Sequence, residues 1–179
     1  MRIIAGSRKG ARIFAPGGRE TRPTGDRVRE AAFNLIGPVE GMDVLDLFAG
    51  SDAMGLEALS RGAARVTFVE SDRAAAQAIV RNLEKLDFDD ATVLRLDAGR
   101  KLAADAAAGR RYDLVLIDPP YRMLTGFLPV LEAHLPAVVA PGGMVVVESD
   151  AREEPELPLS KRTSRRYGSA RVTVFEGLS

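Results

Sequence analysis

The stretch Val44–Gly55, with the sequence VLDLFAGSDAMG, decides the fold. It begins with a short apolar run that ends at Phe48, which is typical of a buried β-strand. Gly50 follows at once and permits a tight turn that lets the backbone approach a ligand. A helix-like run then opens at Ala53. A strand, a glycine turn and a helix in this order predict one unit of an open α/β sheet, with a ligand site beyond the carboxyl end of the strand.

The alternation of strand and helix continues along the chain from this unit. The strand-like runs are Val44–Phe48, Val66–Val69, Thr92–Leu96, Leu114–Ile117 and Met144–Glu148. The helix-like runs between them are Ala53–Arg61, Arg73–Leu86, Ala98–Ala108 and Phe127–Val139. Two last β-type runs, Lys161–Tyr167 and Arg171–Phe175, are joined through Gly168-Ser169. This order predicts an α/β, Rossmann-like sheet that is mainly parallel and ends in an antiparallel hairpin.

The residues before the first strand form an N-terminal extension. Arg2–Phe14 alternates in character around two glycines, which predicts a β-hairpin. Residues 15–25 carry two prolines and three glycines, a composition typical of a loop. Asp26 then predicts the cap of a helix that runs to about Ile36, where Gly37-Pro38 ends it.

Charge is distributed unevenly over a chain whose net charge is zero. Residues 1–29 hold eight Lys or Arg against two acids, a net +6, so the remainder carries −6. A basic arm on an acidic body fits a phosphate-rich partner that touches one face, although a solvated extension would have the same composition. The residues expected to contact RNA phosphates are Arg8, Lys9, Arg12, Arg22 and Arg27. A second basic cluster comprises Lys161, Arg162, Arg165, Arg166 and Arg171.

Length and composition bound the class of protein. We expect one domain over 179 residues, with a hairpin and arm at 1–25 and a Rossmann-like core at 26–179. The chain has no cysteine and a single histidine, His134, so we expect neither a disulfide framework nor a metal site. The apolar runs are too short to span a bilayer, and the N-terminus lacks a signal-peptide core. These features predict a cytoplasmic protein with no membrane partner.

The loops after the first three strands carry residues suited to a nucleoside ligand. Backbone amides of the first loop can hold an anionic group. Glu70, at the end of the second strand, can accept hydrogen bonds from both hydroxyls of a ribose, or it caps the next helix. Asp97 could accept from an adenine amine while the amide of Ala98 meets a ring nitrogen. The residues expected to bind a cofactor are Asp46, Phe48, Gly50, Ser51, Gly55, Glu70, Ser71, Asp97 and Ala98.

The sharpest signal is Asp118-Pro119-Pro120-Tyr121, directly after the fourth strand-like run. Its two prolines fix the backbone and remove two N–H donors, which leaves a rigid set of acceptors. A planar amine can donate both hydrogens to the Asp118 carboxylate and a nearby carbonyl, and it then turns its lone pair toward an electrophile. Tyr121 supplies a flat face on which a base can stack. We therefore expect Asp118, Pro119 and Tyr121 to be the catalytic residues.

Asp-Pro-Pro-Tyr resembles the motif of amino-methyltransferases that act on adenine, cytosine, guanine and glutamine amides. The wider sequence is similar to the bacterial 16S ribosomal RNA guanine-N2 methyltransferase family, and this resemblance covers essentially the whole chain. The segments that carry it are Arg2–Gly6, Thr21–Glu30, Val44–Gly55, Leu56–Ala63 and Phe68–Asp72. The segment from Thr21 to Glu30 is the most specific to that family. The order of elements is also that of a Rossmann-like class I methyltransferase.

The resemblance implies S-adenosylmethionine as the cofactor and the N2 amine of a guanine as the methyl acceptor. It also implies ribosomal RNA and the small ribosomal subunit as partners, and it places Arg22–Asp26 close to the cofactor as a lid. Asp52 is a departure, because the family usually has glycine there. Its carboxylate falls where the methionine part of the cofactor is expected, so it bears on cofactor affinity.

Other functions stay open at this point. A DNA adenine or cytosine amino-methyltransferase uses the same four-residue motif, but this chain lacks room for a target-recognition domain. Methylation of protein glutamine usually has Asn in place of Asp118. A non-catalytic RNA-binding or assembly protein that retains the fold is favoured only by Asp52. A nicotinamide dehydrogenase would leave the Asp-Pro-Pro-Tyr motif unexplained.

Overall fold

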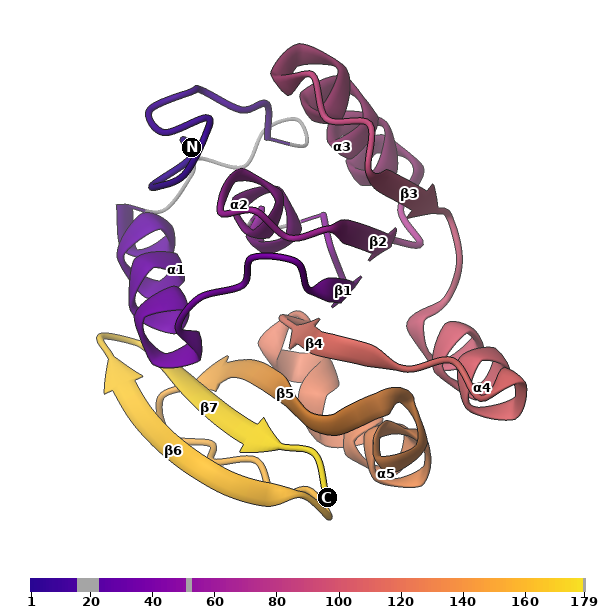
Figure 1. The fold of residues 1–179 in the computed structure, drawn as a ribbon. Coiled ribbons are helices and arrows are strands. Elements are labelled where there is room, and N and C mark those ends of the chain that lie inside the picture. The colour runs from indigo at the N-terminus through magenta and orange to yellow at the C-terminus, as the bar shows by residue number, and fades with distance from the viewer. Residues whose placement is uncertain (16–22, 51–52, 179) are drawn as a thin grey trace.

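The computed structural model describes residues 1–15, 23–50 and 53–178 (Figure 1). A seven-stranded sheet with the order β3-β2-β1-β4-β5-β7-β6 forms its centre. The strands are β1 (Asp43–Leu47), β2 (Arg65–Val69), β3 (Ala91–Leu94), β4 (Tyr112–Ile117), β5 (Val139–Asp150), β6 (Ser160–Tyr167) and β7 (Ala170–Glu176). The helices are α1 (Pro23–Ile36), α2 (Met54–Ser60), α3 (Arg73–Leu86), α4 (Ala98–Ala108) and α5 (Tyr121–Val138).

The direction of the strands confirms the expected architecture. The pairs β2–β3, β1–β2, β1–β4 and β4–β5 are parallel. β7 runs antiparallel to both of its neighbours, β5 and β6. The molecule therefore has a mainly parallel Rossmann-like sheet that is closed by an antiparallel C-terminal hairpin, as the sequence predicts.

Helices cover both faces of this sheet (Figure 1). On one face α1, α2 and α3 bury a core that includes Phe33, Leu56 and Ile79. On the other face α4 and α5 bury a second core that includes Leu102 and Leu131. The central strands are buried on both faces, which is why they stand in the sequence as continuous apolar runs rather than alternating ones.

The start of α1 differs from the expectation. The helix begins at Pro23, so the prediction that Asp26 caps it is wrong. Asp26 lies in the first turn, and its carboxylate pairs with Arg29 at 2.8 Å on the next turn. Proline suits the first turn of a helix because its missing N–H would have no partner there. The end of the helix is as predicted, since Gly37 follows Ile36 with a φ of 86°.

The start of α5 also differs. The helix begins at Tyr121 rather than near Phe127, so the tyrosine belongs to the helix and not to a loop. Pro120 occupies the N-cap position, where its fixed φ of −50° leads the chain into the helix. β5 begins at Val139, well before the predicted start at Met144, because Val139 already pairs with β4. The predicted bounds of α3 and α4 are confirmed.

The N-terminal hairpin is confirmed in outline. Arg2 and Arg12 form an antiparallel bridge, and the Ile3 amide donates to the Ala11 carbonyl at 2.9 Å. Within residues 1–15 the hairpin has this bridge but no regular strand. No helix in the described part of the chain is both long and apolar enough to cross a membrane.

Candidate active site

The carboxyl ends of the parallel strands meet at one edge of the sheet. Leu47, the last residue of β1, pairs with Val69 of β2 and with Ile117 of β4. Ile117 in turn pairs with Val147 of β5. Since the strands are in register, the loops that follow them start side by side. Most of the predicted site residues that the structure describes lie at or near this edge. They are Asp46, Phe48, Gly50, Gly55, Glu70, Ser71, Asp97, Ala98, Asp118, Pro119 and Tyr121.

Asp46 anchors the loop between β1 and α2. Its buried carboxylate accepts a hydrogen bond from the Gly55 amide at 2.8 Å. A Cβ on Gly55 would lie 2.7 Å from that carboxylate and 2.4 Å from the Phe68 ring, so only glycine fits. Phe48 takes a φ of 62°, which turns the chain sharply out of the strand. Ser51 and Asp52 of this loop lie outside the described residues.

Glu70 ties the loops after β1 and β2 together. One carboxylate oxygen accepts from the Gly50 amide at 3.0 Å, and the other accepts from the Asp72 amide at 2.7 Å. A Cβ on Gly50 would lie 2.7 Å from Glu70 and 2.6 Å from the Ala75 side chain. Glycine therefore allows this close approach. Asp72, not Glu70, caps α3, because its carboxylate accepts from the Ala75 amide. Glu70 is half-buried, so the residue is still partly accessible to a ligand.

Asp97 is the N-cap of α4. Its Oδ1 accepts from the Arg100 amide at 2.9 Å, and the side chain is otherwise exposed. An aromatic pair stands near this cap: Phe48 meets Phe127 of α5 edge to face, with the ring centroids 5.1 Å apart. A Cβ on Gly99 would lie 3.6 Å from the Phe127 ring. The capping acid and the two rings are thus arranged around the start of α4.

Asp118 follows β4 and lines a hollow between α1 and the sheet. Pro119 is buried, and Tyr121 directs its hydroxyl to the Glu148 carboxylate at 3.2 Å. The residues around the hollow are Ala32, Met54, Leu116, Ile117, Asp118, Val146, Glu148 and Val172. Glu148 is a site residue that the sequence analysis missed. The only signal in the sequence was a single acid at the end of an apolar run. The structure adds that this acid follows Val147, which pairs with Ile117 just before Asp118.

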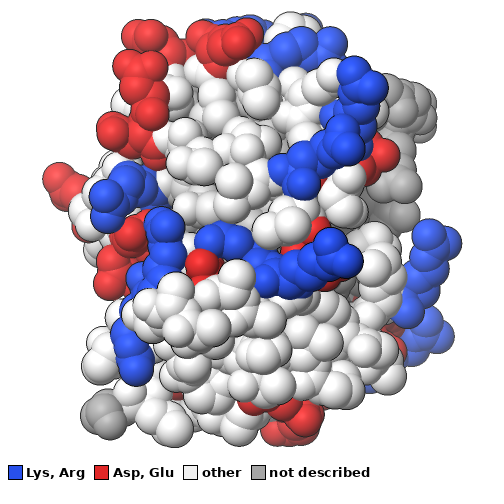
Figure 2. Space-filling model, turned by 90° about the vertical axis from the view of Figure 1, so that its right-hand side faces the viewer, with Lys and Arg blue, Asp and Glu red and all other residues white. Residues whose placement is uncertain are grey.

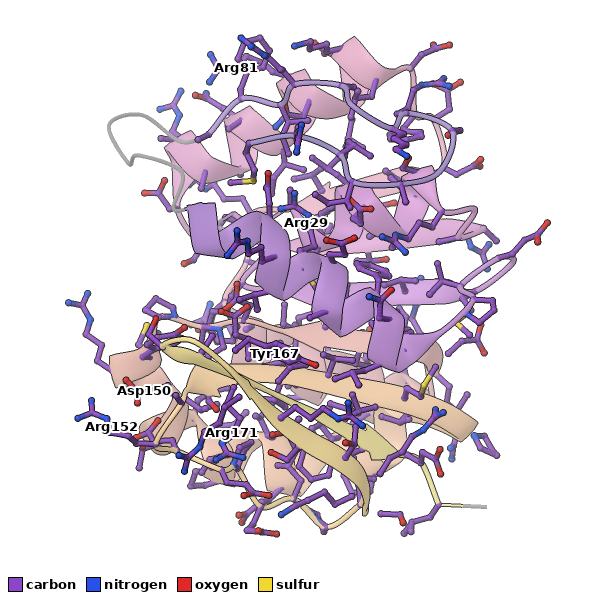
Figure 3. All side chains as sticks on the ribbon, turned by 90° about the vertical axis from the view of Figure 1, so that its left-hand side faces the viewer. Arg29, Arg81, Asp150, Arg152, Tyr167 and Arg171 are labelled. Atoms are coloured by element: carbon purple, nitrogen blue, oxygen red, sulfur yellow. The ribbon has the colours of Figure 1, made fainter. Side chains whose placement is uncertain are left out.

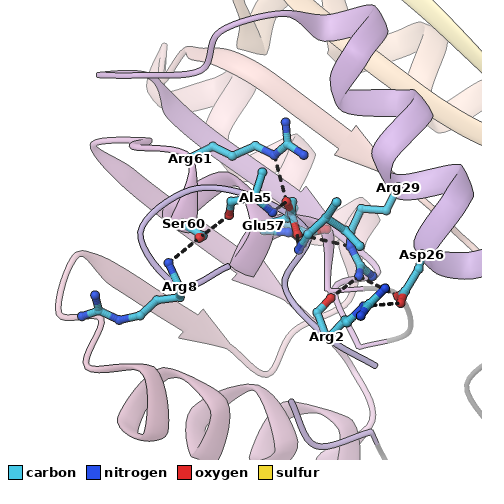
Figure 4. Close-up of polar contacts among 11 residues, drawn as sticks. Arg2, Ala5, Arg8, Asp26, Arg29, Glu57, Ser60 and Arg61 are labelled. Atoms are coloured by element: carbon cyan, nitrogen blue, oxygen red, sulfur yellow. Dashed lines mark hydrogen bonds and ion pairs between the residues drawn. The ribbon is translucent and has the colours of Figure 1, made fainter. Parts of the chain in front are cut away.

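The N-terminal hairpin is docked on α2 through a buried acid (Figure 4). Glu57 is fully buried and accepts from the Ile4 and Ala5 amides, each at 2.9 Å. The same carboxylate pairs with Arg29 of α1 at 3.5 Å and with Arg61 at 2.9 Å. Arg29, 1% exposed, thereby links α1 to the hairpin and to α2. This network fixes the basic extension to the body of the molecule.

The structure separates the predicted RNA-binding cations. Arg8 donates from Nε to the Leu86 carbonyl at 2.6 Å and lies over the Phe88 ring, so it helps to hold the hairpin. Lys9, Arg12 and Arg27 are exposed. Arg22 lies outside the described residues. An RNA-binding role for all five stays a prediction.

Phe14 is a feature of the hairpin that the sequence analysis missed. Half of its surface is exposed, and it lies next to two cations of α3. The charged groups of Arg81 and Lys85 stand 5.7 Å and 4.8 Å from the ring centroid. Figure 3 shows Arg81 at the α3 end of the molecule, far from Arg171 on β7. An exposed ring between cations is the combination found where proteins stack unpaired bases.

The second basic cluster is largely paired with acids. Lys161 contacts Glu154 at 3.1 Å and Glu156 at 2.5 Å. Arg171 is buried and also contacts Glu154. Arg165 and Arg166 of the same cluster are exposed. Figure 2 views the side of the molecule where α3, β3 and α4 lie in Figure 1, away from β6, and there too basic side chains are interspersed with acidic ones.

The acids in the described part of the site are not arranged as in a metal centre. No group of three or more His, Asp or Glu side chains in residues 1–15, 23–50 and 53–178 is placed to hold a metal ion. Asp46, near the end of β1, and Glu70, directly after β2, instead contact backbone amides. Such an edge can bind hydroxyl and amine donors of an organic ligand.

Comparison with known proteins places the chain in a family. The family model described as Conserved hypothetical protein 95 matches residues 1–176. YlbH of Bacillus subtilis, named as a candidate rRNA methyltransferase, is 38% identical, with 98% of each chain covered. Ribosomal RNA small subunit methyltransferase D of Escherichia coli K12 is 40% identical, covering 84% of this chain and 75% of its own. The solved structure of yhhF, a candidate methyltransferase of Escherichia coli, is 35% identical with a TM-score of 0.84, covering 100% of this chain and 98% of its own. The chain therefore belongs to the Conserved hypothetical protein 95 family and is a relative of the ribosomal RNA small subunit methyltransferases D.

Proposed function

We propose that this chain methylates the exocyclic N2 amine of a guanine in 16S ribosomal RNA of the small subunit. The observation that carries the proposal is the position of Asp118-Pro119-Pro120-Tyr121 at the carboxyl edge, where Asp118 lines a hollow. The broader activity is S-adenosylmethionine-dependent methylation of ribosomal RNA, which is supported by the relatives named as rRNA methyltransferases. Residues 1–25 and 26–179 would act in this as the arm and the core of one methyltransferase domain.

The edge of the sheet suits this cofactor. The carboxylate of half-buried Glu70 is the expected acceptor for the ribose hydroxyls. Gly50 has no side chain, which allows the first loop to lie against Glu70. Asp97 and the amide of Ala98 are assigned to the adenine, next to the pair of aromatic rings. The further residues assigned to the cofactor are Asp46, Phe48, Ser51, Gly55 and Ser71. When bound, the cofactor supplies an electrophilic methyl group on its sulfonium.

Asp118 and the Pro119 carbonyl would position the target amine. They accept its two hydrogens, so the lone pair of the nitrogen faces the methyl group. This fixed orientation contributes much of the rate, because the donor is already strongly electrophilic. The carboxylate also stabilises the positive charge that develops on nitrogen. As the nitrogen–carbon bond forms, the bond from that carbon to the cofactor sulfur would break, and the nitrogen, now acidic, would release one proton to water.

Tyr121 would hold the base by stacking. Its ring is fixed at the start of α5 and its hydroxyl is directed to Glu148. A base reaches this position only after it leaves its own stack, which costs least at an unpaired nucleotide. The exposed cations of the hairpin, Lys9 and Arg12, would contact phosphates around that nucleotide. Because the proposed substrate is ribosomal RNA, we propose that the protein acts in the cytoplasm.

The test is mass mapping of ribosomal RNA from a strain that lacks the gene. We expect one guanine of 16S RNA to lose one methyl group. The wild-type gene should restore that group and a gene with Asp118→Ala should not. Unchanged 16S RNA together with a methyl group missing from DNA would instead support a DNA amino-methyltransferase. Unchanged RNA and DNA would support a non-catalytic assembly protein.

A further inference from the structure

Glu148 lies beside Asp118 at the edge of the sheet. β4 and β5 are parallel and in register, with Ile117 opposite Val147. Asp118 and Glu148 are the next residues on the two chains, and neighbouring strands lie about 4.8 Å apart. Both line the same hollow. The structure therefore presents two carboxylates side by side where the target base is expected.

The other walls of the hollow are apolar. Val172, the β7 partner of Glu148, closes the side beyond β5. Ala32 of α1 and Met54 of α2 stand over the strands. In such surroundings a donor or acceptor of the bound base that finds no partner costs more than it would in water. A base that lies against the two carboxylates at the mouth of this hollow is therefore selected by matched hydrogen bonds.

We propose that Glu148 is a specificity-determining residue that accepts the N1–H of guanine while Asp118 accepts from the N2 amine. The inference rests on the proposed function. Guanine presents two neighbouring donors on this edge, N1–H and the amine, which match two neighbouring carboxylates. Adenine N1 and cytosine N3 are acceptors at the equivalent place beside the amine. A carboxylate repels such a lone pair, so Glu148 rejects both bases although each has an exocyclic amine.

Tyr121 is the positioning residue for this carboxylate. Its hydroxyl donates to Glu148 Oε1 at 3.2 Å, from the first residue of α5. A carboxylate has about four acceptor sites, so it can accept from the tyrosine and from a base at the same time. The hydrogen bond fixes the direction in which the carboxylate points into the hollow. The motif tyrosine thereby serves stacking with its ring and base selection with its hydroxyl.

The experiment compares Glu148→Gln with the wild type on two substrates. Small subunits are reconstituted with 16S RNA transcripts that carry guanine or adenine at the position found by mass mapping. Methyl transfer from labelled S-adenosylmethionine gives kcat/KM for each. An amide can donate to adenine N1, as a carboxylate cannot. We expect the ratio of guanine to adenine methylation to fall about 10- to 100-fold, the change that corresponds to one mismatched hydrogen-bonding group.

Two variants serve as controls. Asp150→Asn removes the same charge from the same strand, and Asp150 pairs with Arg152 outside the hollow. Its guanine-to-adenine ratio should equal that of the wild type. Tyr121→Phe keeps the ring and removes the hydroxyl, so the ratio should fall less than in Glu148→Gln. Cofactor affinity and unfolding temperature are measured for all three variants.

The outcomes separate this inference from the proposed function. An unchanged ratio in Glu148→Gln, at any level of activity, would overturn the role in base selection. Equal loss on both substrates with intact cofactor binding would make Glu148 a structural residue and would also overturn it. Failure of the wild type to methylate subunits that carry guanine would instead reject the proposed function.

Discussion

A methyl group on Gly6 would lie 1.8 Å from the carbonyl oxygen of Ser60. The hairpin therefore touches the end of α2 backbone to backbone. Around this contact the Ser7 amide donates to the Ser60 carbonyl at 2.7 Å, and the Ser60 hydroxyl donates to the Ala5 carbonyl at 2.6 Å. Gly6 also has a φ of 83°, which glycine adopts without strain. This close contact is one of several that hold the hairpin, together with those of Glu57 and Arg8.

Gly6→Ala should destabilise the protein, because the added methyl group forces the hairpin away from α2. Gly10→Ala is the matched control: Gly10 has nearly the same φ, 82°, but open space around it. The control should lose about 1 kcal/mol from backbone strain alone, and Gly6→Ala should lose at least about 2 kcal/mol more. Denaturant unfolding of the two variants measures the difference. Equal losses would mean that the hairpin does not need the close contact.

Asp118→Ala should keep the fold and bind the cofactor normally but lose methyl transfer. The reason is that this carboxylate lines the hollow and is assigned to the target amine rather than to the cofactor. Orienting groups of this kind contribute about 100-fold or more to the rate. Transfer to small subunits and calorimetry with S-adenosylmethionine together give the answer. More than about a tenth of the wild-type activity would contradict the assignment.

Glu70→Gln should weaken cofactor binding by roughly 1–3 kcal/mol, the range for a lost charge-assisted hydrogen bond. The amide oxygen still accepts from one backbone amide, so the loops after β1 and β2 stay closer to their native arrangement than with alanine. Methyl transfer at saturating cofactor should change far less. Calorimetric titration of the variant measures the affinity, with Glu84→Gln, an exposed acid on α3, as the control. Equal dissociation constants for Glu70→Gln and the wild type would show that Glu70 does not bind the cofactor and only contacts backbone amides.

The sequence predicts this edge of the sheet well for a physical reason. Parallel strands end together, so residues far apart in sequence, such as Glu70, Asp97 and Asp118, can be placed at one edge from their position after a strand alone. Glu148 was not predicted as a site residue because it was the last residue of the expected strand. Its neighbour across the sheet, Asp118, is known only from the register of β5 on β4. Hydrogen-bond partners of side chains could not be predicted from the sequence either. Arg8 reads as a free cation in the sequence, yet it is turned toward the end of α3.

Phe14→Leu should weaken RNA binding by about 1–3 kcal/mol, the contribution of one stacked base. The backbone that carries the ring is held in place, because Asn82 accepts from the Phe14 amide at 2.7 Å and donates to its carbonyl at 2.9 Å. Phe14→Tyr keeps a flat ring and should bind as the wild type does. Filter binding to a 16S RNA fragment at fixed salt compares the two variants. Equal affinity of the leucine variant would show that the ring does not stack on RNA.

Lys9→Gln combined with Arg12→Gln should flatten the salt dependence of RNA binding. Each cation that contacts a phosphate steepens the log–log slope by about 0.7 to 0.9 units, so two contacts predict a change of roughly one and a half to two units. Arg8 is left intact because its contact with Leu86 supports the fold. Arg165→Gln with Arg166→Gln removes the same charge from the exposed edge strand β6 and serves as the matched control. RNA affinity is measured over a salt series, and cofactor affinity should not move in either double variant. A flattened slope in the β6 double variant, with an unchanged slope in the hairpin double variant, would show that β6 and not the hairpin contacts the phosphates.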